Sequence, residues 1–394
     1  MATSAPPEGV HGERKRVMAP EAVSPAWRRA AEMSGAGDLV MGPLQGHHHE
    51  TYVFPLAAGP DRGPTVRWKC REPRAGLLWF DRRCFASEDQ LVTALHGRIT
   101  SVPEIIEVDG FRLQRFVEGE TLGALHPSGT RVPDHLTDQI VDLFRQLVVV
   151  TPETLTVKRR CRAADRPENG DSDGFLERLV RFAEERVHRR NLDRFGALFT
   201  ELGLDEESFE RLRKHVLGLG QRPFCLLHAD LHRENFVADR TGRLWTIDWE
   251  LALVGDPLYD LATHLYLMRY PARQASRLAA GWAAAVERER PGSSRGWQRD
   301  LGPLIDFKRA QSVFTDVIRV ALTLPGPGEP AHWRRVVHGA LRLRGVLVAA
   351  AAPLGLDTVP GTARIAAALT RWSRREADTA PGAATAATAA RPRG

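Results

Sequence analysis

The pattern of apolar residues changes near residue 120, and this change limits the fold more than any other feature of the chain. Before it, residues 38–41, 50–56 and 65–70 are short runs of strand-forming side chains bounded by glycine and proline. After it, apolar residues recur mostly at three- and four-residue spacing, which is the period of a helix. A β-rich part followed by a larger helical part predicts an α+β protein with two lobes.

The first part also contains signals for a helix and a hairpin. Ser87 is a suitable N-cap for a helix over residues 87–98, with Leu91 and Leu95 on one face. Residues 104–109 and 111–117 form two further strand-like runs, separated by the turn signal Asp109-Gly110. We therefore expect three strands, a helix and then two strands.

The second part predicts a series of helices and two less ordered ends. The helical segments are residues 136–149, 174–187, 205–219, 257–268, 273–288, 304–322 and 331–350. Residues 1–37 are expected to be a flexible extension with a short helix near 26–33, and residues 377–394 a disordered, low-complexity tail. The expected lobes are then residues 38–119 and residues 120–376.

The densest group of polar residues lies in a strand-like island inside the helical part. The segment LLHADLHRENF carries Asp230 and Asn235, and the next apolar run, LWTIDWE, carries Asp248. Phosphoryl transfer needs one carboxylate to orient a hydroxyl and accept its proton, and further oxygen ligands to hold magnesium on the phosphates. The spacing of these three residues therefore indicates a phosphotransferase site.

These residues give the chain its family resemblance. The segment resembles the aminoglycoside phosphotransferase family, relatives of choline kinases and protein kinases, in its His-x-Asp-x-x-x-x-Asn loop and the Ile-Asp that follows. Residues 255–262, GDPLYDLA, resemble the family's next motif. The resemblance implies a protein-kinase-like fold, Asp230 as catalytic base, Asn235 and Asp248 as magnesium ligands, and Asp256 and Asp260 as structural supports. Read without the resemblance, Asp256 before Pro257 is a helix N-cap.

The first part supplies candidate residues for binding a nucleotide. Lys69 lies on the third expected strand, where a lysine would pair with the α- and β-phosphates of ATP. Glu88, early in the expected helix, is the best carboxylate to hold it, with Glu72 and Asp89 as alternatives. Gly42 and Gly46 lie in a loop that resembles the family's phosphate loop, and Arg115 to Val117 resemble the hinge that meets adenine. His47, His48 and His49 in this loop receive no role.

Composition excludes several other classes of protein. The chain has 394 residues, 43% hydrophobic and 26% charged, as is usual for globular proteins. No apolar stretch approaches the ~18 residues of a membrane span, so we expect a cytoplasmic protein without membrane contact. The four cysteines form no CxxC pair and are expected to be reduced thiols. The net charge of +6 favours anionic partners, but no aromatic-interleaved basic stripe indicates nucleic acid.

Two other readings of the same residues stay open. The alternation of His228, Asp230 and His232 is also compatible with a zinc enzyme, although no second ligand cluster with metal-like spacing accompanies it. A non-catalytic kinase-like binding protein is the second alternative. The full set of expected polar positions is present, which argues against a decayed site.

The phosphate acceptor is the largest open question. We expect a hydroxyl of a small molecule, an antibiotic or a metabolite, with a Ser or Thr of a natural-product precursor peptide as the alternative. ATP is the expected donor, and the sequence does not exclude GTP or fix the oligomeric state. Only seven residues separate Asp248 from Asp256, which leaves no room for the activation segment of a regulated protein kinase. Arginines dominate residues 269–297 and 331–346, which indicates either a solvated basic face or a neutral or anionic acceptor.

Overall fold

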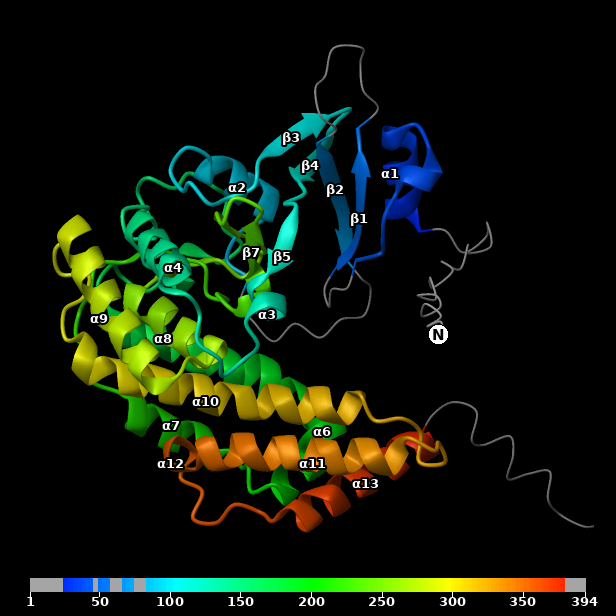
Figure 1. Ribbon diagram of the computed structural model, residues 1–394. Helices are drawn as coiled ribbons and strands as arrows, with labels where there is room; N and C mark the ends of the chain where they lie inside the picture. Colours follow the sequence, from blue (N-terminus) through cyan, green and yellow to red (C-terminus); the bar gives the residue numbers. More distant parts are fainter. Residues whose placement is uncertain (1–23, 45–48, 57–65, 74–82, 380–394) are drawn as a thin grey trace, which may run out of the picture. The chain divides into compact units, whose positions relative to one another are not determined.

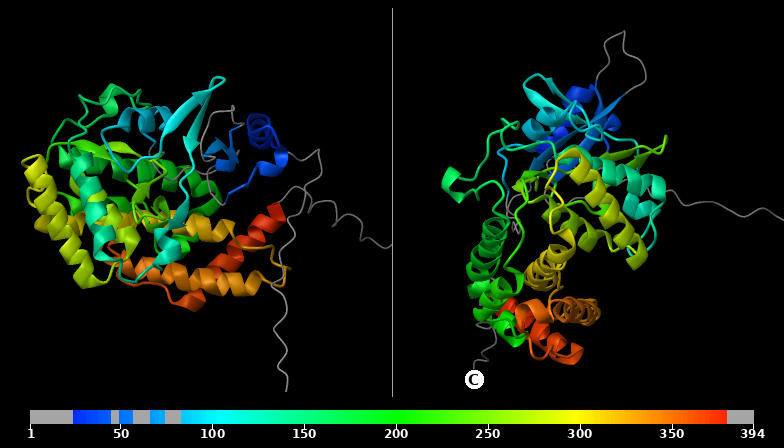
Figure 2. Two further views of the ribbon diagram at one scale, coloured as in Figure 1. Left: turned by 45° about the horizontal axis from the view of Figure 1, so that its top comes forward. Right: turned by 90° about the vertical axis from the view of Figure 1, so that its left-hand side faces the viewer.

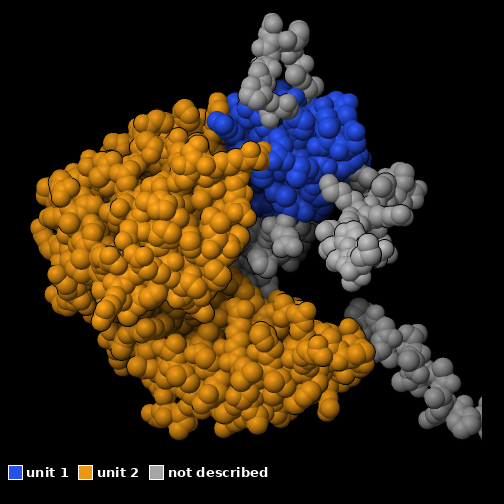
Figure 3. Space-filling view, in the orientation of Figure 1, with its two compact units in different colours: residues 1–77, 105–116 blue, residues 78–104, 117–394 orange. Residues whose placement is uncertain are grey.

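The computed structural model describes residues 24–44, 49–56, 66–73 and 83–379 (Figure 1). The chain divides into two compact units, coloured separately in Figure 3. The first unit comprises residues 1–77 and 105–116, and the second comprises residues 78–104 and 117–394. The segment 78–104, which was expected in the first lobe, groups with the second unit. The lobe boundary expected at residue 119 stays a prediction.

The first unit is an antiparallel sheet with one helix against it. Its strands, in spatial order, are β1 (His49–Pro55), β2 (Arg67–Pro73), β4 (Phe111–Arg115) and β3 (Ile105–Val108). The helix α1 (Pro25–Ser34) begins at Ser24, whose side chain accepts a hydrogen bond from the Trp27 N–H. The core between helix and sheet consists of Ala26, Ala30, Tyr52, Phe54, Trp68, Cys70 and Leu113.

The predicted hairpin is confirmed and the first predicted strand is wrong. Asp109 and Gly110 both have positive φ, 50° and 78°, as a two-residue turn between β3 and β4 requires. Residues 38–41, expected as a strand, contain instead the 3₁₀ turn η2 (Gly37–Leu39), and Met41 makes a single bridge to Val53. The Val40 N–H bonds back to the Gly37 carbonyl, which curls this segment and removes it from the sheet.

The second unit is mostly helical. The helix α2 (Glu88–Leu95) starts at Ser87, which caps the Gln90 N–H as predicted. Figures 1 and 2 show α4 (Asp134–Leu147) beside α9 (Ala272–Glu289), and α10 (Trp297–Leu322) between α8 (Pro257–Met268) and α11 (His332–Ala349). The helix α13 (Thr362–Thr379) packs on α11 and runs past residue 377, where the tail was expected to begin.

The polar motif of residues 226–250 lies on and between short strands of this helical unit. The strands β5 (Gly119–Thr121), β7 (Phe236–Asp239) and β8 (Leu244–Thr246) form one antiparallel sheet, and β6 (Cys225–Leu227) pairs with β9 (Leu253–Gly255). The remaining elements are α3 (Leu122–Leu125), η3 (Ala163–Asp165), α5 (Ser172–Phe182), the π-helix η4 (Ala183–His188), η5 (Arg189–Asn191), α6 (Leu192–Glu201), α7 (Glu207–Val216), η6 (Arg233–Asn235) and α12 (Ala351–Leu354).

Some helices differ from the prediction for clear reasons. The expected start of α10 at residue 304 follows Pro303, but the helix begins at Trp297 and includes that proline. Proline costs a helix interior one hydrogen bond, and here burial of one side of a long helix outweighs that loss. In the described part of the chain no helix is long and apolar enough to cross a membrane.

Candidate active site

The loop that follows β6 is held by a carboxylate of α8. Asp260, buried in the first turn of α8, accepts hydrogen bonds from the backbone N–H groups of His228, at 2.9 Å, and Ala229, at 2.8 Å. Ala229 has a φ of 65°, a conformation that costs about 1 kcal/mol or more for a residue with a side chain. Burial raises the pKa of Asp260 to about 6, and the two N–H groups oppose this. The loop is therefore fixed where Asp230 begins.

Asp230 is partly exposed and is oriented by two neighbours. The Asn235 amide donates to the Asp230 carbonyl at 2.9 Å and to its carboxylate at 3.3 Å. His232 Nε2 lies 3.4 Å from the same carboxylate. Burial disfavours a charged imidazole, but the hydrogen bond and charge of Asp230 prevail and raise the pKa of His232. The carboxylate of Asp230 thus stays accessible while its rotation is restricted.

Backbone pairing brings Asn235 and Asp248 to the same end of two strands. The Ile247 N–H donates to the Asn235 carbonyl at 3.0 Å, directly after the β7–β8 pairing of Phe236 with Thr246. Asp248 follows with a φ of 63°, which turns the chain sharply away from β8. The three motif residues Asp230, Asn235 and Asp248 therefore gather around one short stretch of the second unit, as the sequence predicted for their backbone.

Asp248 belongs to a cluster of three carboxylates. One oxygen from each of Glu88, Asp248 and Glu250 lies within 4.8 Å of the others. Glu88 also accepts a hydrogen bond from the Trp249 N–H at 3.1 Å, and Arg83 pairs with Glu250 at 2.8 Å. A compact set of hard oxygen donors suits a cation such as magnesium.

Glu250 has no role in the sequence-based interpretation, although it lies in the quoted motif. The signal was its position two residues after Asp248, but the sharp turn at Asp248 that brings the two carboxylates together is visible only in the structure. Glu88 was expected to face a lysine, and within the second unit its contact is with the backbone next to Asp248.

His228 is a buried structural residue. Its Nε2 lies 3.1 Å from the Ile247 carbonyl and its ring packs on Trp249 at 4.6 Å between centroids. Burial lowers the pKa of His228 to about 4, so the ring is neutral at pH 7. Among the described residues the carboxylate cluster is the one group of three His, Cys, Asp or Glu ligands this close together, and it contains no imidazole. The donor set thus favours a hard cation over zinc.

A buried network of ion pairs lies at the start of α8. Asp256 caps α8 through the Leu258 N–H, as predicted, and also accepts bonds from Arg222 at 2.8 and 2.7 Å. The other end of the Arg222 guanidinium donates to Asp300 at 2.6 Å. The side chains of Arg222 and Asp256 are 0% exposed. No local pattern around Arg222 predicts this role, because its partners lie 34 and 78 positions away in the chain.

The other predicted residues divide between the two units. In the first unit, Lys69 lies half-buried on β2 opposite Val53 and Gln114, Gly42 precedes β1, and Arg115 ends β4. Gly46, with His47 and His48, lies outside the described residues. Val117 belongs to the second unit, just before β5. The pairing of Lys69 with Glu88, and the nucleotide-binding roles of all these residues, stay predictions.

Comparisons with known proteins complete the description of the site. A family model described as "Phosphotransferase enzyme family" matches residues 58–297, more than half of the chain. A search of curated proteins gave no significant match.

Solved structures similar to the chain include three phosphate-transferring proteins. A choline/ethanolamine kinase family protein from Mesorhizobium loti is 16% identical, with a TM-score of 0.45, over 88% of this chain and 98% of that one. A macrolide 2'-phosphotransferase from Brachybacterium faecium is 17% identical, with a TM-score of 0.47, over 82% and 94%. A choline kinase from Streptococcus pneumoniae is 14% identical, with a TM-score of 0.46, over 82% and 96%.

Proposed function

Since the chain belongs to the phosphotransferase enzyme family, we propose that it transfers the γ-phosphoryl group of ATP to a hydroxyl group of a small molecule. One observation carries this proposal more than any other. Asp230 is held by Asn235 and His232, and the segment that follows them presents Asp248 and Glu250, whose carboxylates lie beside that of Glu88 in α2. Phosphoryl transfer needs this combination of a base and a cation site.

Asp230 is the catalytic base in this proposal. Its carboxylate accepts the proton of the acceptor hydroxyl and orients that oxygen for attack on the phosphorus. The hydrogen bond from Asn235 fixes one carboxylate oxygen, which leaves the other for the substrate. His232 lies against the same carboxylate oxygen. General-base catalysis of this kind contributes roughly 10²–10⁴-fold in rate.

Asn235 and Asp248 would hold magnesium, and Glu250 is a further ligand candidate from the same cluster. When bound, the ion would neutralise charge on the phosphates of the nucleotide. The cluster also explains the position of Glu88, which fixes the backbone beside Asp248 through the Trp249 N–H. These side chains hold the oxygen donors close together, so little reorganisation accompanies cation binding.

Residues of the first unit bind the nucleotide in this proposal, as the resemblance implied. Lys69 contacts the phosphates, Gly42 and Gly46 line the phosphate loop, and Arg115 and Val117 border the adenine. The half-buried position of Lys69 on a strand supports such a role, because a rigid strand positions an ammonium group precisely enough for phosphate. Glu88 serves this lysine if the pairing expected from the sequence forms.

A small molecule is the acceptor that the site favours. Soon after Asp248 the chain enters β9, whose residues 253–255 pair with β6. This described stretch therefore lacks the segment that binds peptides in protein kinases. The macrolide 2'-phosphotransferase and the choline kinase among the similar structures act on small molecules by their names.

The test is an assay of phosphate transfer from labelled ATP to a panel of hydroxylated small molecules. We expect magnesium-dependent transfer to at least one class of acceptor, and slow ATP hydrolysis by water in its absence. GTP is assayed beside ATP to identify the donor. A protein that binds ATP and magnesium but transfers phosphate to neither acceptors nor water is a binding protein, and this result would refute the proposal.

A further inference from the structure

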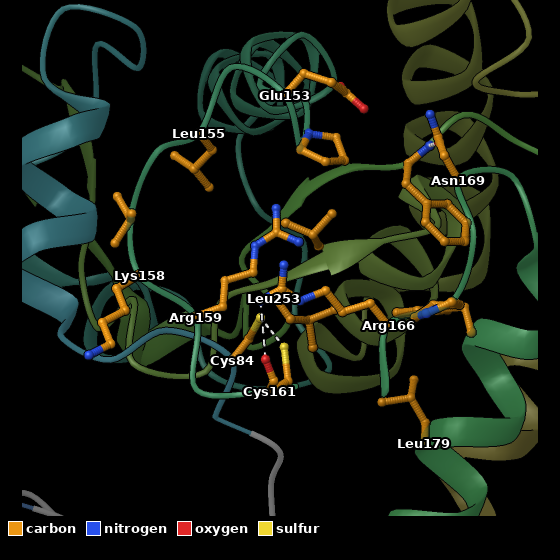
Figure 4. A pocket seen from close by; sticks show the side chains of 16 residues that line it. Cys84, Glu153, Leu155, Lys158, Arg159, Cys161, Arg166, Asn169, Leu179 and Leu253 are labelled. Atoms are coloured by element: carbon orange, nitrogen blue, oxygen red, sulfur yellow. Dashed lines mark hydrogen bonds between the residues drawn. The ribbon is translucent and has the colours of Figure 1, made fainter. Parts of the chain in front are cut away.

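Two cysteines that are far apart in the sequence meet in the second unit. The Sγ atoms of Cys84 and Cys161 lie 3.9 Å apart, although 77 positions separate the residues in the chain. Neither side chain belongs to the carboxylate cluster or to the Asp230 loop. Figure 4 shows the two sulfurs together at the wall of a cavity, with Arg159 and Arg166 nearby.

Backbone pairing creates this contact. Phe85 forms an antiparallel bridge with Arg159. On one side of the bridge the Arg160 N–H donates to the Cys84 carbonyl at 2.7 Å, and on the other the Ala86 N–H donates to the Lys158 carbonyl at 2.9 Å. The two segments are therefore tied together at the cysteines, and the approach of the sulfurs does not depend on side-chain rotamers alone.

The two thiols differ in access. Both residues line a cavity of about 600 Å³, but the Cys84 side chain is buried, whereas that of Cys161 is half-buried. The hydrogen bond with Cys161 and burial raise the pKa of the Cys84 thiol, while the charge of Arg159 opposes this. A dissolved oxidant thus meets Cys161 first, with Cys84 as a protonated thiol behind it.

We propose that Cys84 and Cys161 form a reversible oxidation site, at which a peroxide converts the two thiols into a disulfide. The Cys161 sulfur attacks the peroxide, the O–O bond breaks, and the products are a sulfenic acid and water. The Cys84 sulfur then attacks the Cys161 sulfur, and the hydroxyl leaves with the Cys84 proton as water. Two electrons pass from the sulfurs to the peroxide. The sulfurs move about 2 Å closer to reach bonding distance.

The disulfide would tether a segment that leads into the candidate active site. Arg83, next to Cys84, pairs with Glu250, and Glu88 at the start of α2 contacts the backbone beside Asp248. A disulfide between residues 77 positions apart restricts the unfolded chain and should raise the melting temperature by roughly 5 °C. Any effect on phosphoryl transfer rests on the proposed function, whereas formation of the disulfide does not.

The experiment treats the purified full-length protein with hydrogen peroxide, blocks remaining thiols by alkylation, and maps peptides without reduction by mass spectrometry. We expect one cross-linked pair that contains Cys84 and Cys161 and has lost two hydrogens. Cys70 and Cys225, both buried elsewhere, should be alkylated after denaturation. Dithiothreitol should restore all four thiols and the original melting temperature.

Two variants provide the controls. Cys161→Ser removes the more accessible of the two thiols and should abolish both the cross-link and the rise in melting temperature. Cys70→Ser should oxidise like the wild type. The wild-type peptide map decides the question even if a variant does not fold. The proposal is overturned if all four cysteines stay alkylatable, if Cys161 ends as a sulfinic acid without a cross-link, or if Cys84 pairs with Cys70 or Cys225.

Discussion

At the scale of single residues, the candidate site depends on two strained positions. Ala229 and Asp248 both have positive φ. Ala229 directly precedes Asp230, the proposed base, and Asp248 is itself a proposed magnesium ligand. The strain at Ala229 is offset by two hydrogen bonds to Asp260. Such strain costs of the order of 1–3 kcal/mol per residue and persists where surrounding contacts require it. Here the positive φ of Ala229 shapes the loop in which Asp230 begins, and that of Asp248 turns the chain sharply after β8.

Replacing Asp230 by Asn keeps the shape of the side chain and removes the base. We expect the rate of phosphate transfer to fall roughly 10²–10⁴-fold, with nucleotide affinity nearly unchanged. Steady-state kinetics and calorimetric titration with ATP measure the two quantities. The control is Asp134→Asn, an exposed residue in the first turn of α4. A D230N enzyme within about threefold of the wild type would remove Asp230 from the catalytic role.

Replacing Asp248 by Ala should uncouple the nucleotide from magnesium. We expect activity to be lost and ATP affinity to become the same with and without magnesium, because the proposed ligand of the ion is absent. Calorimetric titrations under both conditions measure this. Glu250→Gln, compared in parallel, should raise the magnesium concentration needed for half-maximal activity if Glu250 is also a ligand. A D248A protein with full magnesium dependence would contradict the assignment.

At the scale of elements, α8 is the support on which the site is built. Asp260 in its first turn fixes the Asp230 loop, while Asp256 at its start joins the buried network of Arg222 and Asp300. His264, one turn after Asp260, donates a hydrogen bond from Nδ1 to the Leu231 carbonyl, and the Met268 carbonyl at the end of α8 accepts one from Arg233 Nε. The whole length of α8 thus holds residues 228–233, and the site depends on its packing against α10.

Replacing Arg222 by Met tests this support. The change leaves Asp256 and Asp300 buried without their shared cation, which typically costs about 3–5 kcal/mol of unfolding free energy. Urea denaturation followed by fluorescence measures the loss. Arg299→Met is the matched control, because Arg299 also pairs with Asp300 but is largely exposed, and we expect a much smaller effect. Equal stability of R222M and wild type would show that the network is dispensable.

At the scale of the whole molecule, local features were predictable and long-range ones were not. The cap at Ser87, the turn at Asp109-Gly110 and the start of α8 each depend on a few adjacent residues, and the structure confirms them. Asn235 and Asp248 flank the paired strands β7 and β8, so their proximity depends on neighbouring segments of the chain. Arg222 bonds residues 34 and 78 positions away, and such partners follow only from tertiary packing.

The folded protein should lose stability in mild acid because of a buried histidine. Burial lowers the pKa of His264 to about 3, whereas an unfolded histidine titrates near 6.5. Between these values the unfolded state binds a proton that the folded state excludes, so stability falls as pH decreases, by up to roughly 5 kcal/mol. Asp260, with its pKa raised to about 6, opposes this between about pH 4 and 6.

Comparison with a variant isolates the histidine. Urea denaturation of wild type and His264→Gln at pH 7, 5.5 and 4.5 measures the unfolding free energy of each protein. The difference between the two values should narrow as pH falls, because only the wild type loses stability through protonation of His264 in the unfolded state. The contribution of Asp260 is common to both proteins and cancels. Parallel pH profiles for the two proteins would contradict the low pKa of His264.

We propose that the acceptor binds against the helical surface of the second unit, where the charge of the lining residues predicts the sign of the acceptor's charge. The structure uses some of the arginines counted in the sequence, since Arg290 donates to the Phe224 carbonyl and Arg342 pairs with Asp316. Others stay exposed, and a cavity of about 960 Å³ between α8, α9, α10 and α11 is lined by three arginines and one carboxylate, namely Arg269, Arg309, Arg342 and Asp316. A polycationic acceptor needs carboxylates to replace its water, and this surface offers few.

We therefore expect neutral or anionic acceptors to be phosphorylated with higher kcat/KM than a polycationic aminosugar. Raising salt from about 50 to about 300 mM shortens the screening length roughly 2.5-fold, so KM for an anionic acceptor should rise while KM for a neutral one stays constant. Kinetics with kanamycin-like, neutral and acidic acceptors at both salt concentrations measure this. Efficient turnover of the polycation alone would contradict the charge argument and leave the phosphotransferase assignment unchanged, because that assignment rests on the Asp230 loop and the carboxylate cluster and not on the arginines.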